Sequence, residues 1–308
     1  MKYDSIIIIG PTASGKTSIS IELAKILKTE IVNADSMYIY KNLSIGTAKP
    51  TKEEMQGITH HIIDVANPTE KFNVYDYRTV AEKTIANLKD KNLLPVVVGG
   101  TGFYIDSLFN NFTYGSESIS NGVREKIQAD LNQYGKEFIY KQLQDIDPIT
   151  ANKLHVNDAV RVSRALEIIL STGTSKQNII NNSEPILKHP LIVGLDMPRD
   201  ILYDRINRRV DIMIDNGLID EIKGLIGLGL NPDNAQSMKG IGYKEMYQYL
   251  NQEISLEDAI EKIKQHTRNY AKRQITWFKR NSNINWISVN NKSIDDITKE
   301  IINIFNNK

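Results

Sequence analysis

The segment Gly10–Thr17, with the sequence GPTASGKT, constrains the fold of this chain more than any other feature. It lies between the apolar run Ser5–Ile9 and the helical pattern of Ser18–Leu27, which is the strand-to-helix context of a P-loop. In such a loop successive backbone N–H groups point at an anion, and the helix dipole and Lys16 add positive charge. A chance glycine turn is the alternative. The pattern predicts a bound di- or triphosphate without saying which.

All eight residues of this segment are predicted to bind the phosphates, and Thr17 is also predicted to hold a Mg²⁺ ion against them. These residues are Gly10, Pro11, Thr12, Ala13, Ser14, Gly15, Lys16 and Thr17.

Composition narrows the possible functions. The 308 residues include 38 lysines and arginines and 37 aspartates and glutamates, so any nucleic-acid site must be local. The chain has no cysteine, which excludes a disulfide framework, a thiol nucleophile and cysteine-based zinc sites. Met1–Asp4 lead directly into the first expected strand, and no apolar run approaches membrane-spanning length. We therefore expect a cytoplasmic protein with no membrane partner.

Polar residues follow two further buried runs. Glu30–Ala34 ends at Asp35, and Leu93–Val98 ends in a Gly-Gly-Thr-Gly turn that contains Thr101. In open α/β sheets ligands bind beyond the carboxyl ends of the strands, so Asp35 and Thr101 should face the same crevice as the P-loop. Taken alone, Asp35 could equally be a turn residue that caps a helix. A short strand is expected at His60–Val65.

Strand and helix signals alternate along residues 1–114 and return at 189–308. This predicts an α/β fold with a mostly parallel, P-loop NTPase-like sheet flanked by helices. Residues 115–188 lack strand signals, and we expect an all-helical insertion domain there. Its helix through Val162 and Leu166 places Arg161 and Arg164 on another face, and a polar loop is expected at Ser171–Asn178.

Two stretches carry clustered basic residues. A helix starting at Pro198 carries Arg205, Arg208 and Arg209, which a solvated face with nearby aspartates would also explain. The segment from Lys262 to Arg280 has no acidic residue, and its cations are interleaved with aromatic rings. Because ordinary surfaces mix the two signs of charge, this run favours a contact with a phosphate backbone.

The residues alone leave the chemistry open between phosphoryl and diphosphate transfer. A small-molecule kinase would use Asp35 to deprotonate an acceptor hydroxyl. A motor-type ATPase is disfavoured, because no apolar strand ends in Asp-Glu. An RNA-binding scaffold with a vestigial P-loop is the non-catalytic alternative.

Eight segments, in order over nearly the whole chain, resemble those of the tRNA dimethylallyltransferases, also called tRNA isopentenyl-diphosphate transferases. They are Gly10–Thr17, Ala34–Met37, Ile45–Pro50, His60–Asp64, Val98–Tyr104, Asn157–Glu167, Gly240–Glu245 and Thr267–Gln274. The resemblance implies transfer of a dimethylallyl group from its diphosphate to N6 of the adenosine just 3′ of the anticodon. The P-loop would then bind a leaving diphosphate, with Asp35 as general base and Thr101 as the second active-site residue.

The same resemblance implies contacts with the tRNA anticodon arm, from which the target base must be flipped out. These contacts are assigned to Asp35, Ser36, Met37, Tyr38, Thr101, Arg124, Ala159, Val160, Arg161, Val162, Ser163, Gly240, Ile241, Gly242, Tyr243, Lys244, Glu245, Arg268, Lys272, Arg273 and Arg280. The chain departs from the family at Tyr38 and Val160, where glutamine is usual. We expect dimethylallyl diphosphate and tRNA as partners and a monomer, although no sequence feature reports the oligomeric state or whether ATP binds.

Overall fold

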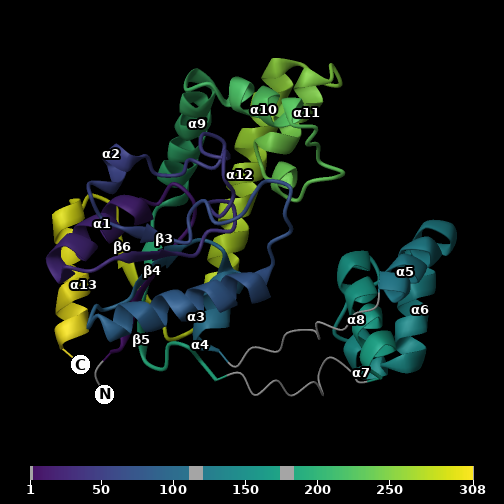
Figure 1. Cartoon of the computed structure of the whole chain (residues 1–308), viewed down its shortest axis with the longest axis horizontal. Coiled ribbons are helices and arrows are strands. Elements are labelled where there is room, and N and C mark those ends of the chain that lie inside the picture. The colour runs from purple at the N-terminus through teal and green to yellow at the C-terminus, as the bar shows by residue number, and fades with distance from the viewer. Residues whose placement is uncertain (1–2, 111–120, 174–183, 308) are drawn as a thin grey trace. The chain divides into compact units, whose positions relative to one another are not determined.

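The computed structural model describes residues 3–110, 121–173 and 184–307, which fall into two compact units. The core unit comprises residues 1–110 and 185–308, and the helical unit comprises residues 111–184. The sequence places the insertion at 115–188. Figure 1 shows both units and labels their helices and strands.

Within the described residues, the core unit contains one six-stranded sheet with the order β3-β2-β4-β1-β5-β6. Every neighbouring pair in it is parallel. The strands are β1 (Ser5–Ile9), β2 (Ile31–Asn33), β3 (His60–His61), β4 (Val96–Gly99), β5 (Pro190–Asp196) and β6 (Asn285–Ser288). The predicted α/β fold class, with a mostly parallel sheet flanked by helices, is confirmed.

Helices cover both faces of this sheet, as the central strand β1 demonstrates. Ile7 and Ile9 of β1 pack in a hydrophobic core with α3 (Val74–Asp90) and α4 (Gly102–Phe109). Ile6 and Ile8 pack in a second core with α1 (Lys16–Leu27) and α13 (Ile294–Asn306). A strand buried on both faces needs a continuous apolar run, which explains four consecutive isoleucines.

The helices of the core unit connect the strands and extend beyond them. They are α1 (Lys16–Leu27), α2 (Lys52–Met55), α3 (Val74–Asp90), α4 (Gly102–Phe109), α9 (Arg199–Asp215), α10 (Leu218–Gly227), the 3₁₀ turn η1 (Ser237–Lys239), α11 (Tyr243–Leu250), α12 (Leu256–Phe278) and α13 (Ile294–Asn306). The long α12 packs against α9 and α11 and runs from there toward the sheet (Figure 1).

Two sequence predictions of local structure are corrected. The strand expected at His60–Val65 ends at His61, because Ile62 and Asp64 have φ values of 62° and 56°, in the left-handed region that no strand adopts. The loop expected from Ser171 begins later, because α8 continues to Thr172 and ends at Gly173, whose φ is 67°. The rest of that loop, from residue 174, lies outside the described residues.

The described part of the helical unit, residues 121–173, consists of four helices around a small apolar core. They are α5 (Asn121–Tyr134), α6 (Lys136–Ile146), α7 (Pro148–Ala151) and α8 (Ala159–Thr172). Glu167 of α8 pairs with Arg164 at 3.0 Å and with Arg124 of α5 at 3.2 Å. None of the helices in the described part of the chain combines the length and apolar content that a membrane crossing requires.

Candidate active site

The segment Gly10–Thr17, which we call the cradle, forms the turn between β1 and α1. Ala13 and Gly15 have φ values of 64° and 90°, and no side chain caps the amino end of α1. The amine of Lys16 folds back onto the backbone, where it donates to the carbonyls of Gly10 at 3.0 Å and Pro11 at 2.7 Å. Ser14 Oγ is buried and has no hydrogen-bond partner within the described structure. Buried polar groups are normally paired, so this hydroxyl fits a site built for an absent polar ligand.

Gln274 of α12 ties the cradle to the turn after β4. Its Oε1 accepts from the backbone N–H of Thr12 at 2.8 Å, and its Nε2 donates to the carbonyl of Gly100 at 2.9 Å. A Cβ on Gly100 would lie 2.2 Å from that Nε2, so only glycine leaves room for the link. Sequence reasoning assigned Gln274 no role in the site, since the cradle lies more than two hundred and fifty positions away.

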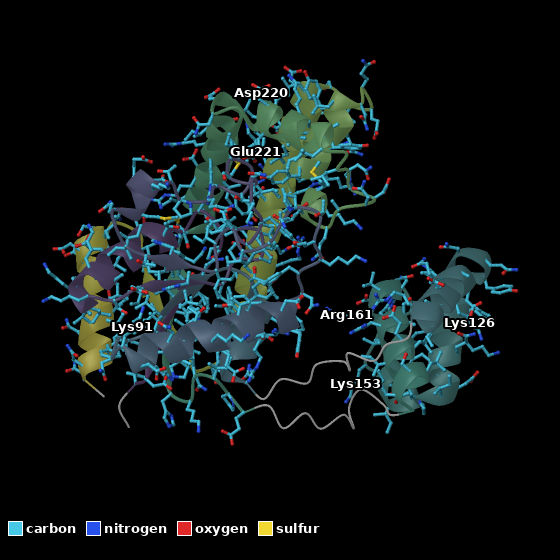
Figure 2. The ribbon with its side chains drawn as sticks, viewed as in Figure 1. Lys91, Lys126, Lys153, Arg161, Asp220 and Glu221 are labelled. Atoms are coloured by element: carbon cyan, nitrogen blue, oxygen red, sulfur yellow. The ribbon has the colours of Figure 1, made fainter. Side chains whose placement is uncertain are left out.

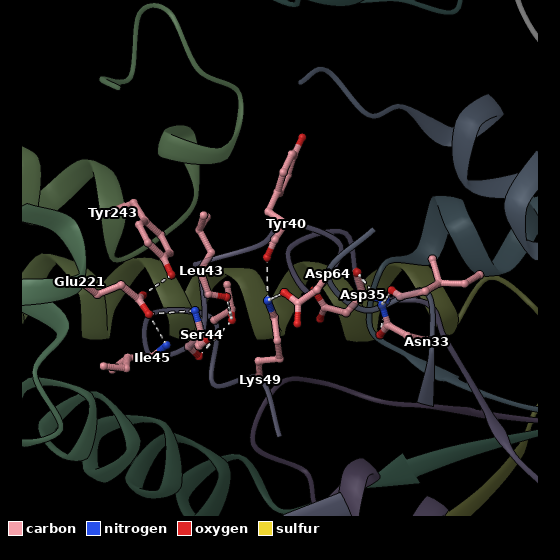
Figure 3. Close-up of polar contacts among 12 residues, drawn as sticks. Asn33, Asp35, Tyr40, Leu43, Ser44, Ile45, Lys49, Asp64, Glu221 and Tyr243 are labelled. Carbon is pink, nitrogen blue, oxygen red and sulfur yellow. Dashed lines mark hydrogen bonds and ion pairs between the residues drawn. The ribbon is translucent and has the colours of Figure 1, made fainter. Parts of the chain in front are cut away.

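Asp35 lies just beyond β2 and is oriented by the strand's last residue, the buried Asn33. The amide of Asn33 accepts from the N–H of Asp35 and donates to its carbonyl, both at 3.0 Å (Figure 3). Asp35 Oδ1 accepts from the N–H of Met37 at 2.9 Å. Among the described residues Oδ2 has no hydrogen-bond partner. The carboxylate is thus fixed by one oxygen, and the other is available to take a proton.

Thr101 is linked to the neighbourhood of Asp35 by hydrogen bonds to the next residue in the chain, Ser36. Its Oγ1 accepts from the N–H of Ser36 at 3.0 Å and donates to Ser36 Oγ at 3.2 Å. Tyr270 of α12 lies near Thr101 and Asp35, and its pKa is raised chiefly by burial and also by the charge of Asp35. Tyr270 therefore stays protonated near neutral pH. It is a further residue of this site that sequence reasoning did not assign.

One cavity of about 740 Å³ brings the predicted groups together, and Lys16, Thr17, Asp35 and Tyr38 are among its lining residues. Neither Thr101 nor its partner Ser36 lines it, although Ser36 directly follows the lining residue Asp35 in the chain. This volume is typical of small-molecule sites, which run from about 300 to 1,000 Å³. The carboxylate and the cradle therefore face one space, as sequence reasoning expected.

The electrostatics of the cavity depend on burial. Burial lowers the pKa of Lys16 to about 8, with the charge of Asp35 opposing this shift and that of Arg209 adding to it. Burial also raises the pKa of Tyr38 to about 12, so its hydroxyl stays protonated and donates to the carbonyl of Ala48 at 2.8 Å. An anion between Lys16 and Arg209 would relieve the repulsion between these two cations.

The three arginines predicted on one helix separate into different roles on α9. Arg209 lines the cavity, with Nη1 donating to Thr12 Oγ1 at 3.3 Å and Nη2 donating to the carbonyl of Ala48 at 3.2 Å. Arg205 also lines the cavity, whereas Arg208 is exposed and pairs with Asp204. The alternative of a solvated helix face therefore holds for Arg208, and it stays open for Arg205, which is also exposed. Arg209 is the second cation at the cradle.

Several predicted tRNA contacts have side chains that the structure buries. Tyr243 and Glu245 are 0% and 4% exposed, and Glu245 accepts from the N–H of Gly242 at 2.8 Å and contacts His266 Nδ1 at 2.6 Å. In the segment Gly240–Glu245 the side chain of Lys244 is exposed. The side chains of Tyr243 and Glu245 are thus engaged within the fold, and the tRNA contact of segment Gly240–Glu245 stays a prediction.

The predicted tRNA contacts of the helical unit also include both buried and exposed side chains. Val162 is 0% exposed and packs in the core of that unit. Val160 is 81% exposed, and Arg161 is exposed beside Asp158, which it contacts at 3.3 Å. Arg124 is held by Glu167, as described above. The tRNA contacts assigned to residues 159–163 stay predictions.

The basic residues of α12 do not form one continuous surface. Arg268 is half-buried and donates to Asn207 Oδ1 of α9 at 2.6 Å, whereas Lys272 and Arg273 are exposed. Arg280, just after the helix, stacks 3.8 Å above the ring of Trp277 and lies 3.9 Å from Asp106 Oδ2. Among the predicted phosphate contacts of this segment, Arg280 thus stands apart, because it lies beyond the end of α12 and contacts Trp277 and Asp106.

A larger cavity, of about 990 Å³, lies around Arg280 and Trp277, near the amino ends of β5 and β6. It contains neither Asp35 nor any residue of the cradle. Ligands of open parallel sheets bind at the carboxyl ends of the strands, so position rather than size identifies the smaller cavity as the candidate active site.

The described residues contain no group of three or more histidines, aspartates and glutamates that could hold a metal ion. Thr17 is among the residues that line the cavity. A Mg²⁺ ion that bound there would take one protein ligand from Thr17 and the others from phosphate oxygens and water, which is the usual coordination of Mg²⁺ at a P-loop. The residues present fit such an ion.

These features define a P-loop-like α/β protein in which the cradle and a carboxylate face one cavity. The family model described as IPP transferase matches residues 38–281. The tRNA dimethylallyltransferase of Alkaliphilus metalliredigens is 44% identical over 303 residues, covering 98% of this chain and 97% of that protein. That of Halalkalibacterium halodurans is 42% identical over 310 residues, covering 100% and 98%. The chain therefore belongs to the IPP transferase family.

Solved structures agree with this assignment. The full-length tRNA isopentenylpyrophosphate transferase of Bacillus halodurans matches with a TM-score of 0.73 and 42% identity, covering 99% of this chain and 95% of that one. A eukaryotic dimethylallyltransferase described as acting on tRNA matches with a TM-score of 0.83 and 32% identity, covering 97% of this chain and 77% of that one.

Proposed function

We propose that this chain transfers a dimethylallyl group from dimethylallyl diphosphate to N6 of the adenosine just 3′ of the anticodon in tRNA, releasing diphosphate. The observation that carries the proposal is the single cavity shared by Lys16 of the cradle and the carboxylate of Asp35. Membership of the family and the names of the relatives support it. A tRNA substrate also favours the cytoplasmic location expected from the sequence.

The cradle accounts for departure of the diphosphate. As the allylic C–O bond breaks, negative charge grows on the diphosphate oxygens, and Lys16, Arg209 and the backbone N–H groups stabilise it most when it is greatest. A Mg²⁺ ion held by Thr17 would supply further charge neutralisation.

Asp35 accounts for activation of the acceptor, which is N6 of the adenosine. The lone pair of N6 is delocalised into the purine, so N6 becomes nucleophilic enough only as its proton leaves. Asp35 Oδ2, which has no partner among the described residues, is the base that accepts this proton. Thr101 and Tyr270 provide hydroxyl groups near that carboxylate, where they would orient the flipped base.

One incubation tests the reaction. The protein is given dimethylallyl diphosphate and ATP carrying different radiolabels, with unmodified tRNA as acceptor. The proposal expects the allylic label to appear in tRNA and to localise to one adenosine after nuclease digestion. Transfer of phosphate from ATP, with no need for the allylic diphosphate, would favour a kinase. Binding of tRNA with no transfer of either label would favour a scaffold.

A further inference from the structure

Three backbone N–H groups of the loop after Leu43 converge on the carboxylate of Glu221 in α10. Ser44 and Ile45 donate to Oε2 at 2.8 and 2.7 Å, and Gly46 donates to Oε1 at 3.0 Å. The hydroxyl of Tyr243 donates to Oε1 at 2.6 Å (Figure 3). We call these four contacts the Glu221 clamp. A Cβ on Gly46 would lie 2.7 Å from the Tyr243 ring, so the loop approaches α11 as closely as its backbone permits.

The loop held by this clamp is closed by its own hydrogen bonds. Thr47 Oγ1 donates to the carbonyl of Leu43 at 2.8 Å, the N–H of Ala48 to Ile45 at 2.9 Å and the N–H of Lys49 to Ser44 at 3.0 Å. Ala48 has a φ of 51°, an unfavourable value for a residue with a side chain. A displacement of residues 44–46 is therefore transmitted to Ala48.

Ser44, Ile45, Thr47 and Ala48 of this loop line the active-site cavity, and the carbonyl of Ala48 is where the loop contacts Arg209. It accepts from the Tyr38 hydroxyl at 2.8 Å and from Arg209 Nη2 at 3.2 Å. The other terminal nitrogen of Arg209 reaches Thr12 of the cradle. The guanidinium is thus held between a carbonyl that the loop positions and the cradle itself.

We propose that Glu221 is a positioning residue for diphosphate binding, acting through the loop 44–48 on Arg209. Glu221 does not line the active-site cavity, so it has no direct contact with a ligand there. The other end of the loop has its own anchor, because the buried Lys49 amine donates to the carbonyl of Tyr40 and to Asp64, both at 2.6 Å (Figure 3). Weakening the clamp should therefore displace the loop without unfolding it. The inference rests on the proposed function in taking the ligand to be a diphosphate.

The test compares two neighbouring carboxylates of α10 that Figure 2 labels. Glu221→Gln keeps the shape of the side chain but presents an NH₂ group to backbone donors. Asp220→Asn is the matched control, because Asp220 is 83% exposed and pairs with Lys223 at 3.3 Å. Titration calorimetry with inorganic diphosphate should give about a tenfold higher Kd for Glu221→Gln, as expected for loss of a charge-assisted hydrogen bond, and no change for Asp220→Asn.

A double-mutant cycle separates positioning from a general structural role. If Glu221 acts through Arg209, Glu221→Gln should raise Kd little further in an Arg209→Ala background. Tyr243→Phe, which removes one contact of the clamp, should shift Kd in the same direction by a smaller factor. Independent effects of Glu221→Gln and Arg209→Ala would overturn the proposal, as would an unchanged Kd in Glu221→Gln.

Steady-state assays distinguish this inference from the function on which it rests. The inference expects a higher KM for dimethylallyl diphosphate in Glu221→Gln, with KM for tRNA unchanged. Equal changes in both KM values and a lower Tm would contradict it. If the wild-type protein transferred no dimethylallyl group, the proposed function would fail, while the diphosphate cycle would still decide the role of Glu221.

Discussion

The cradle and the Glu221 clamp are both places where a loop directs polar groups at an anion, and they differ in where the anion comes from. In the clamp the protein supplies it, and the carboxylate of Glu221 accepts four hydrogen bonds. In the cradle, Ser14 Oγ has no partner among the described residues, and Lys16 is held only by backbone carbonyls. A group of donors satisfied within the fold stabilises it, whereas one left unsatisfied binds a ligand.

The largest effect should follow from removing the proposed base, Asp35, which faces the cradle across the cavity. Asp35→Asn should lower kcat for dimethylallyl transfer by at least about a hundredfold, because general-base catalysis typically contributes that much or more. Binding of tRNA should change little. Single-turnover transfer and filter binding measure the two quantities. Glu22→Gln is the control, since Glu22 also lines the cavity but pairs with Lys25. Equal losses of transfer and binding would show that Asp35 holds RNA and is not the base.

The second largest effect should separate two arginines that are neighbours in sequence. Arg209→Ala should lower kcat/KM for dimethylallyl diphosphate by about thirtyfold, since hydrogen bonds between charged groups contribute roughly 1.5–3 kcal/mol. Arg208→Ala should leave it unchanged, because Arg208 is exposed and pairs with Asp204. Similar kinetics for the two variants would mean that the ligand does not extend from the cradle to α9.

These arginines also show how far sequence reasoning extends. The sheet could be predicted because its buried strands are runs of isoleucine and valine, and the P-loop because Gly10, Gly15, Lys16 and Thr17 fall within one segment of eight residues. The position of Arg209 depends on how α9 is rotated about its axis when Leu202, Ile206 and Val210 pack into the core. No local pattern reports that rotation.

Residues that act across long sequence separations were missed for the same reason. Glu221 lies 177 positions from Ser44, and Gln274 lies 262 positions from Thr12. No sequence motif indicates which residue Glu221 or Gln274 contacts. Conversely, Tyr243 belongs to a family segment, and only the fold shows that its side chain is buried against the clamp. The segments that form the site could be predicted from the sequence, whereas the hydrogen bonds between residues far apart in the chain could not.

A smaller effect should follow from the pKa of Lys16, which burial lowers to about 8. Below that pH the amine is protonated and attracts the diphosphate, and above it the amine is neutral. KM for dimethylallyl diphosphate should therefore be flat below pH 8 and rise above it, approaching about tenfold per pH unit. Lys16→Arg should flatten the profile, because a guanidinium stays charged throughout this range. A wild-type KM independent of pH well above 8 would contradict the argument.

The smallest effect should come from the exposed basic surface of α12, whose partner is a polymer rather than a buried anion. Lys272→Ala should weaken tRNA binding only a fewfold and reduce the slope of log K against log salt concentration by about 0.7–0.9, which is the signature of one lost phosphate contact. Lys299→Ala is the matched control, because Lys299 is exposed on α13 and pairs with Asp295 at 2.8 Å. Filter binding at several salt concentrations measures both variants. KM for dimethylallyl diphosphate should be unaffected by Lys272→Ala, because Lys272 does not line the cavity that contains the cradle. An unchanged salt slope for Lys272→Ala would show that this face of α12 does not contact the RNA.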